Sequence, residues 1–224
     1  MIKAVIFDLD NTLIDFMKMK RMSCEAAISA MIDAGLEMKQ SEAYGNLFEL
    51  YQVHGIENPK IFQIFLKKYT GGVDFRILSS AIASYRKVQY GFLEPYPKVR
   101  RTLIKLTEQG LVLGVVSDAP KLKAWMRLSE MSLADFFKIV ITLGDAKKPK
   151  PDKRPFTMAL KKLGIKPEEV LFVGDNPSRD IEGAKAMGMK AALARYGQVF
   201  PEGKIKPDYY LDDIVMVLKI VKGS

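Results

Sequence analysis

The sequence predicts an α/β protein: a doubly wound, Rossmann-like parallel sheet with an inserted α-helical domain. Short runs of consecutive apolar residues alternate with amphipathic stretches, which is the pattern of strands buried on both faces and the helices that connect them. Residues 16–92 break this alternation, because they carry helical patterns and no convincing strand. Glycines follow several of the amphipathic stretches, where helix ends favour them.

The strand candidates are short and rich in β-branched residues. The stronger ones are residues 4–7, 111–116, 139–143 and 170–173, and the weaker ones are 190–194 and 209–211. Amphipathic patterns predict helices over 98–109, 121–131, 155–163 and 180–187. Gly110, Gly164 and Gly188 follow three of these helices at the expected C-terminal position.

The insert contains helical patterns over 24–34, 42–51, 61–69 and 75–90, separated by Asn58-Pro59 and Gly71-Gly72. The sequence therefore predicts two domains. Residues 1–15 and 93–224 form the Rossmann-like catalytic core, and residues 16–92 form a helical domain.

Composition limits the class of protein. The chain has 224 residues, 48% hydrophobic and 27% charged, which is ordinary for a globular protein. No apolar run reaches the ~18 residues of a membrane span, so we expect no membrane partner, and the N-terminus predicts a strand rather than a signal peptide. The single cysteine, Cys24, cannot form an intrachain disulfide and favours a cytoplasmic location. Asn and Gln are scarce beside Lys and Glu, which is typical of thermophiles.

The formal charge of +9 raises the possibility of a nucleic-acid partner. The basic residues are scattered, apart from a cluster within residues 147–154, and no DNA- or RNA-binding motif accompanies them. We therefore expect a solvated basic surface that attracts anionic metabolites, and no nucleic-acid partner.

Polar side chains follow the predicted strands at the point where each strand ends. Asp8 and Asp10 follow the first strand, Ser117 the second, and Asp175 the fourth, while Lys148 lies in the loop after the third. The carboxyl ends of parallel strands share one edge of a sheet, where ligands bind. We expect these residues to converge there.

These residue types suit phosphoryl transfer. Carboxylates at Asp8 and Asp175 are hard oxygen ligands for Mg²⁺, and Lys148 would offset the charge of a phosphate that approaches them. Ser117 can donate a hydrogen bond to phosphate. Asp8 is the candidate nucleophile, and Asp10 the candidate acid and base that protonates the leaving oxygen and then activates water.

Four motifs together resemble the haloacid dehalogenase superfamily. The D-x-D-x-T motif corresponds to residues 8–12, the Ser after a strand to Ser117, the K-P-x-P loop to residues 148–151, and G-D-x-x-x-x-D to residues 174–180. The resemblance implies a phosphatase in which the insert is a small helical cap of the C1 type. The cap, including Asn58-Pro59, also resembles archaeal members described as glyceraldehyde-3-phosphate phosphatases.

The resemblance implies roles for single residues. Asp8 would be nucleophile and metal ligand, Asp10 acid and base and a ligand through its backbone carbonyl, and Asp175 a direct ligand. Ser117 and Lys148 would bind phosphate. Thr12 would support the loop after the first strand, and Asp180 would contact the metal ligands without binding the metal directly.

Several alternatives stay open at this level. Lys150 also precedes a proline and competes with Lys148, Ser117 could be a turn residue, and Asp180 could cap the helix that follows it. A dehalogenase would lack a carboxylate at the position of Asp10, whereas a phosphomutase would share the core residues. A receiver-like signalling or binding module would lack the insert. The oligomeric state, monomer or homodimer, is not predicted.

Overall fold

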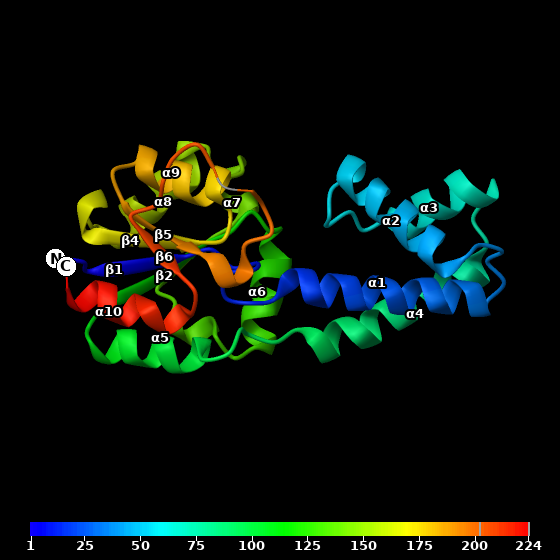
Figure 1. Ribbon diagram of the computed structural model, residues 1–224, viewed down its shortest axis with the longest axis horizontal. Helices are drawn as coiled ribbons and strands as arrows, with labels where there is room; N and C mark the ends of the chain where they lie inside the picture. The colour runs from blue at the N-terminus through cyan, green and yellow to red at the C-terminus, as the bar shows by residue number, and fades with distance from the viewer. Residues whose placement is uncertain (202, 224) are drawn as a thin grey trace. The chain divides into compact units, whose positions relative to one another are not determined.

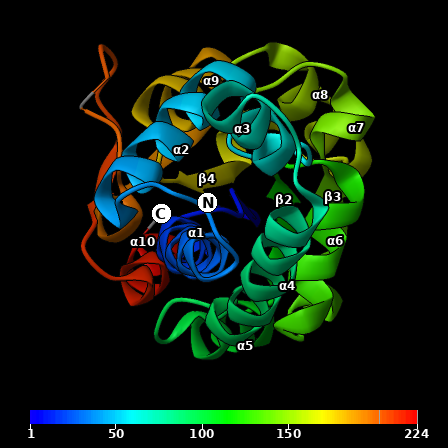
Figure 2. The same cartoon turned by 90° about the vertical axis from the view of Figure 1, so that its right-hand side faces the viewer.

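The computed structural model describes residues 1–201 and 203–223 and divides into two compact units (Figures 1 and 2). One unit comprises Met1–Asp15 and Glu94–Ser224, and the other comprises Phe16–Leu93. The predicted boundaries, after residues 15 and 92, lie within one residue of this division. The two units are described separately below.

The first unit is built on a six-stranded, fully parallel sheet with the order β3-β2-β1-β4-β5-β6. The α/β fold class and all six strand positions are confirmed. The strands are β1 (Ala4–Phe7), β2 (Val112–Val116), β3 (Ile139–Ile141), β4 (Val170–Gly174), β5 (Lys190–Ala194) and β6 (Tyr209–Leu211). Because β1 pairs with both β2 and β4, the chain order reverses at β1, and this reversal is the usual place for a ligand.

Helices cover both faces of the sheet. α5 (Val99–Glu108) and α10 (Val217–Lys222) lie on one face, and α8 (Lys153–Leu163) and α9 (Glu182–Ala186) lie on the other (Figures 1 and 2). Ala4 and Ile6 pack with Phe156 of α8 and Ala184 of α9. The alternate residues of β1 are equally buried, and this explains why its sequence is apolar throughout.

The structure differs from the prediction at the end of β3. The predicted strand included Leu143, but Leu143 begins a short helix, α7 (Leu143–Ala146). Thr142 caps this helix: its Oγ1 lies 2.6 Å from Asp145 Oδ2, and its backbone N–H donates to the same oxygen at 3.0 Å. This reciprocal cap ends the strand early, because it turns the chain into a helix at Thr142.

The remaining helices of this unit differ in detail from the sequence pattern. α6 (Lys121–Glu130) matches its predicted position, whereas the predicted helix 180–187 is divided into a π-helical turn, η3 (Pro177–Ile181), and α9. α10 was not predicted, nor were the 3₁₀ turns η1 (Ala134–Phe136), η2 (Pro167–Glu169), η4 (Arg195–Gly197) and η5 (Ile214–Met216). These elements are only 3 to 6 residues long and too short to show a period.

The second unit contains the four helices that the sequence predicts: α1 (Phe16–Asp33), α2 (Gln40–His54), α3 (Ile61–Thr70) and α4 (Phe75–Phe92). It has its own hydrophobic core, which includes Ile28, Leu47 and Phe65. Among residues 1–201 and 203–223, no helix combines the length and apolarity that a membrane span needs.

α1 begins at Phe16, eight residues before its predicted start at residue 24. The apolar pattern did not reveal this start, because a charged side chain occupies part of the buried face of the helix. Lys20 is buried, its Nζ donates to the Tyr85 hydroxyl at 3.1 Å, and it lies 4.0 Å from the centre of the Tyr51 ring. The aromatic rings and the hydroxyl compensate the ammonium group, so that lysine fits where the pattern requires an apolar residue.

Candidate active site

Three of the predicted site residues, Asp8, Ser117 and Asp175, lie at the carboxyl edge of the sheet directly after strands β1, β2 and β4. Asp8 follows β1, and its N–H donates to Val173 of β4 at 2.8 Å. Ser117 follows β2, and its N–H donates to Ile141 of β3 at 2.9 Å. The sheet hydrogen bonds therefore continue into the site and fix the backbone of the residues that carry the chemistry.

Three carboxylates form the centre of the site. Asp8, Asp175 and Asp180 are all buried, and each contributes an oxygen to a group within 4.8 Å. Burial, together with repulsion from Asp180, raises the pKa of Asp175 to about 9. Burial also raises the pKa of Asp8 to about 8, an effect that Lys150 opposes and that Asp180 and Asp10 increase. Such a cluster strongly favours a bound cation.

The donor set fits a hard divalent cation. Asp175 Oδ2 is buried and has no hydrogen-bond partner among the described residues. A buried carboxylate oxygen without a partner is costly, and a metal ion is one of the few groups that satisfies it. When all three carboxylates are ionised they outnumber the one lysine that contacts them, so a cation that displaces their protons would neutralise the remaining negative charge.

The lysine of this cluster is Lys150, and the prediction of Lys148 was wrong. Lys150 is buried, and its Nζ lies 2.5 Å from Asp8 Oδ1, 2.7 Å from Asp180 Oδ1 and 3.0 Å from the Val116 carbonyl. Lys148 is exposed. Burial alone would lower the pKa of Lys150, but Asp180 and Asp8 more than offset this and raise it.

The two lysines were hard to separate because each precedes a proline. Helix α8 begins at Lys153, after Asp152, which caps it by accepting a hydrogen bond from the Arg154 N–H at 2.9 Å. The loop is further fixed by Asp118, whose Oδ1 accepts from the Lys150 N–H at 2.9 Å.

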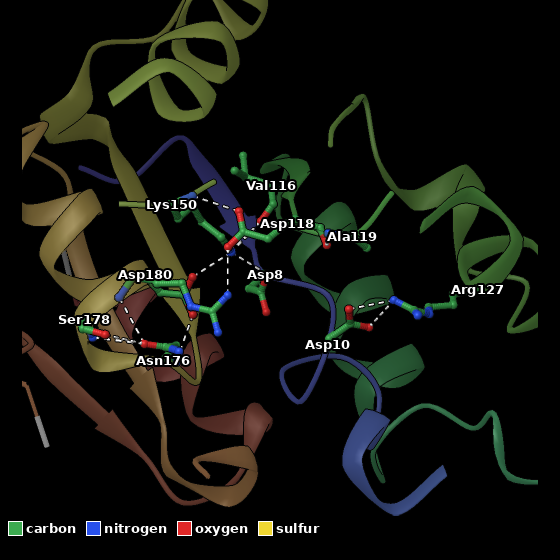
Figure 3. Close-up of polar contacts among 12 residues, drawn as sticks. Asp8, Asp10, Val116, Asp118, Ala119, Arg127, Lys150, Asn176, Ser178 and Asp180 are labelled. Atoms are coloured by element: carbon green, nitrogen blue, oxygen red, sulfur yellow. Dashed lines mark hydrogen bonds and ion pairs between the residues drawn. The ribbon is translucent and has the colours of Figure 1, made fainter. Parts of the chain in front are cut away.

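Asp10 lies apart from the three carboxylates and contacts a residue that the sequence did not reveal. Its two carboxylate oxygens lie 2.8 and 2.7 Å from Arg127 Nη1. Arg127 comes from α6 and is buried. Figure 3 shows the Asp10 carboxylate turned towards Arg127, while Asp8 lies beside Lys150 and Asp180. No motif marked Arg127, because the pairing joins residues 117 positions apart.

Asp180 contacts the centre of the site and does not cap a helix. Its Oδ2 accepts from the Asn176 N–H at 2.9 Å, and the capping role belongs to Asn176, whose side chain accepts from the N–H groups of Ser178 and Arg179. Gly174 makes room for Asp180, since a Cβ atom at Gly174 would lie 2.4 Å from Asp180 Oδ2.

Ser117 and Thr12 occupy supporting positions at the same edge. Ser117 Oγ accepts from the Ala119 N–H at 3.1 Å, so the turn role holds, and its hydroxyl hydrogen is still able to donate. Thr12 is buried, and its carbonyl accepts from the Tyr196 hydroxyl at 2.9 Å, which anchors the loop after β1. Its Oγ1 has no hydrogen-bond partner among the described residues.

A second ion pair joins the turn η3 to the loop after β2. Arg179 Nη1 lies 3.3 Å from Asp118 Oδ2, and the Arg179 guanidinium lies 5.5 Å from the centre of the Phe200 ring. Asp118 therefore links the loop after β2 to both the Lys150 loop and η3.

Comparison with known proteins agrees with this arrangement. The profile of the haloacid dehalogenase-like hydrolases matches residues 5–194. A glyceraldehyde 3-phosphate phosphatase of Methanopyrus kandleri is 35% identical over 200 residues, which cover 88% of this chain and 86% of that protein. Another, of Methanocaldococcus jannaschii, is 34% identical over 224 residues, which cover 100% and 98%.

The same relationship holds among solved structures. A haloacid dehalogenase-type phosphatase from Thermococcus onnurineus superimposes with a TM-score of 0.72 and 25% identity, covering 100% of this chain and 99% of that one. The family profile, the relatives and the fold all extend over most of the chain. The protein belongs to the haloacid dehalogenase-like hydrolase family.

Proposed function

We propose that the protein is a Mg²⁺-dependent phosphatase that hydrolyses a small phosphorylated metabolite through an aspartyl-phosphate on Asp8. The observation that carries this proposal is the buried group formed by Asp8, Lys150, Asp175 and Asp180 at the carboxyl edge of the sheet. Asp10, two residues after the nucleophile, supplies the second carboxylate that the reaction needs.

Asp8 attacks phosphorus in the first step. An oxygen of Asp8 forms a bond to phosphorus, the bond between phosphorus and the leaving oxygen breaks, and Asp10 delivers a proton to that oxygen. In the second step water attacks the phosphorus of the aspartyl-phosphate, the bond to Asp8 breaks, and Asp10 takes a proton from the water. The products are an alcohol and inorganic phosphate, and both carboxylates return to their starting state.

Lys150 orients the nucleophile and offsets charge. Its ammonium group contacts Asp8 and Asp180 and is held by the Val116 carbonyl, so it is fixed before substrate arrives. A fixed positive charge beside the attacking oxygen stabilises the charge that develops during transfer. Ser117, whose hydroxyl hydrogen is able to donate, is the proposed ligand of a phosphate oxygen.

Mg²⁺ would be held by the side chains of Asp8 and Asp175 and by the backbone carbonyl of Asp10. Asp180 would support these ligands without binding the ion directly. When bound, the ion would neutralise charge between the carboxylates and the phosphate. Asp175 Oδ2, buried and without a hydrogen-bond partner among the described residues, is the atom that best supports this assignment.

The relatives suggest the first substrate to test. Both archaeal proteins are named for glyceraldehyde 3-phosphate, a small phosphorylated metabolite of the kind proposed here. The helical unit, residues 16–93, is the proposed cap that selects the substrate and excludes water. We further propose a cytoplasmic location and no nucleic-acid or membrane partner. The thermophile origin that the composition suggests also stays a prediction.

Asp10 separates the phosphatase from a dehalogenase, but not from a phosphomutase. A dehalogenase of the same family needs no acid at this position, so Asp10 favours phosphate chemistry. A phosphomutase shares all the core residues and differs in the acceptor of the phosphoryl group. Product analysis distinguishes the two, since a phosphatase releases inorganic phosphate and a mutase returns an isomeric phosphate ester.

The test uses purified protein with p-nitrophenyl phosphate and with glyceraldehyde 3-phosphate. We expect Mg²⁺-dependent release of nitrophenol and inorganic phosphate that EDTA and Asp8→Asn both abolish. Val53→Ala, at an exposed position of α2, is the control and should retain full activity. Turnover that is independent of Mg²⁺, or that survives Asp8→Asn, contradicts the proposal.

A further inference from the structure

Arg127, which lies outside the four motifs of the family, contacts Asp10 of the first motif. Arg127 Nη1 lies 2.8 and 2.7 Å from the two oxygens of Asp10. The Arg127 side chain is 6% exposed, and that of Asp10 is 22% exposed. This pair is therefore unlike an exposed surface salt bridge, which solvent and salt weaken to a small fraction of its strength.

α6 fixes the position of the Arg127 guanidinium. Ala124 and Leu128, on either side of Arg127 along the helix, are fully buried in the core unit. The end of α6 is also anchored, because Arg100 Nη2 donates to the Met131 carbonyl at 2.6 Å. Arg127 is thus presented to Asp10 from a rigid support, whereas Asp10 lies in the loop that follows β1.

Asp10 needs such a partner because proton transfer depends on the orientation of its carboxylate. A carboxylate that gives a proton to a leaving oxygen must lie within hydrogen-bond reach of that oxygen. The Asp side chain has two rotatable bonds, and loops allow more motion than helices or strands. A contact that engages both carboxylate oxygens restricts both rotations at once.

We propose that Arg127 is a positioning residue that sets the orientation of the Asp10 carboxylate and thereby its efficiency in proton transfer to the leaving group. This inference rests on the proposed phosphatase function. Arg127 does not contact phosphate in this proposal; its effect on the chemistry is exerted through Asp10. Its removal should therefore reproduce the substrate dependence that the loss of Asp10 produces.

The test compares two substrates that differ in their need for a proton. Nitrophenolate leaves without protonation, whereas an alkoxide, as from glyceraldehyde 3-phosphate, does not. We compare kcat/KM, because it reports the transfer to Asp8 and excludes the later hydrolysis step. Arg127→Met should lower kcat/KM for the alkyl phosphate by about 100-fold and for p-nitrophenyl phosphate by less than about 10-fold, the span expected when general acid catalysis is lost.

Four further variants make the result specific. Asp10→Asn should show the same substrate dependence, and the double variant should lose no more than Asp10→Asn alone, because two residues that act as one are not additive. Arg127→Lys should fall between wild type and Arg127→Met, since it retains the positive charge but not the guanidinium geometry that places Nη1 against both Asp10 oxygens. Leu122→Ala, at an exposed position of the same helix, should leave the ratio between the two substrates unchanged.

Equal losses for both substrates, or an additive double variant, would overturn the inference and leave Arg127 with a structural role. If thermal unfolding shows that Arg127→Met does not fold, Arg127→Lys and its double variant with Asp10→Asn carry the same comparison. Failure of the proposed function is distinguishable, because wild-type protein would then hydrolyse neither substrate, and the inference about Arg127 would fall with it.

Discussion

Lys148 and Lys150 show how a small difference in position decides the role of a side chain. Both follow β3 and both precede proline, yet one is exposed and the other is buried between Asp8 and Asp180. The difference arises because Asp118 accepts a hydrogen bond from the Lys150 N–H and holds that residue of the loop against the end of β2. This contact joins residues 32 positions apart, so the local pattern of lysines and prolines could not reveal it.

The two lysines therefore provide a matched pair of substitutions. Lys150→Met should lower kcat by about 100- to 1000-fold, the usual effect of losing a fixed electrostatic partner of the reacting group. It should also lower the free energy of unfolding, because it removes the cation from a buried cluster of carboxylates. Lys148→Met should change kcat by less than about 3-fold, since surface substitutions rarely disturb a site.

Steady-state kinetics and urea unfolding of both variants test this prediction. A large loss in Lys148→Met with normal activity in Lys150→Met would show that the lysine of the site had been assigned wrongly.

The raised pKa values of Asp8 and Asp175 predict how Mg²⁺ binding depends on pH. With pKa values of about 8 and about 9, both carboxyls hold protons near neutral pH when no metal is bound, and Mg²⁺ must displace them. The folded state binds these protons more tightly than the unfolded state. The metal-free protein should therefore lose stability as pH rises from about 4 towards 9.

Mg²⁺ should consequently raise the melting temperature more at about pH 8.5 than at about pH 6.5, because fewer protons compete for the carboxylates. Thermal unfolding in Mg²⁺ and in EDTA at the two pH values measures the difference. Asp175→Asn should remove most of it, and an Mg²⁺ effect that is equal at both pH values would contradict the assignment of these residues.

At the scale of single elements, the π-helical turn η3 and strand β4 form one unit around Asp180. Gly174 ends β4, Asn176 caps the turn, and Asp180 reaches back to the Asn176 N–H. The G-D-x-x-x-x-D spacing thus brings its second aspartate to the first, because the turn bends the chain back on the strand. The glycine is required by space rather than by backbone angle, since a Cβ atom would collide with Asp180.

Gly174→Ala should therefore displace Asp180, lower the melting temperature and reduce kcat by at least about 10-fold, since overpacking a close-packed site costs about 1–3 kcal/mol. Gly45→Ala is the matched control, because Gly45 lies within helix α2 and a Cβ atom there meets nothing within 4 Å. It should be neutral or stabilise by up to about 1 kcal/mol. A Gly174→Ala protein with normal activity and stability would contradict the close packing.

At the scale of the whole molecule, the chain forms two units with separate cores. The helical unit buries its own cluster, which includes Leu47 and Phe65, and the sheet unit buries another between β-strands and helices α8 and α9. Insertion between β1 and α5 leaves the sheet intact, since β1 pairs with β2 and β4 regardless of the length of chain that joins them.

Residues 16–93 expressed alone should fold. We expect a helical circular dichroism spectrum and a cooperative thermal transition, because an independent core supports two-state unfolding. Phe65→Ala in this fragment should lower the free energy of unfolding by about 3–5 kcal/mol, whereas Val53→Ala, at an exposed position, should have little effect. A gradual, non-cooperative transition in the wild-type fragment would contradict an independent core.

The sequence by itself determined the α/β class, all six strands, the long helices, and the position of Asp8, Ser117 and Asp175 at strand ends. These features are encoded locally: burial on both faces requires continuous apolar runs, and polar residues mark where each strand leaves the sheet. Gly110, Gly164 and Gly188 marked helix ends correctly, since all three adopt positive φ angles that glycine favours.

Only the tertiary structure decided which lysine joins the carboxylates, that Asp180 reaches this lysine, and that Arg127 holds Asp10. Each of these depends on contacts between segments that the chain brings together only after folding: the Asp118 contact with the Lys150 loop, the reach of Asp180 to Lys150, and the approach of α6 to the loop after β1. A one-dimensional pattern records periodicity and spacing, but the direction of a long side chain is set by the packing of its distant neighbours.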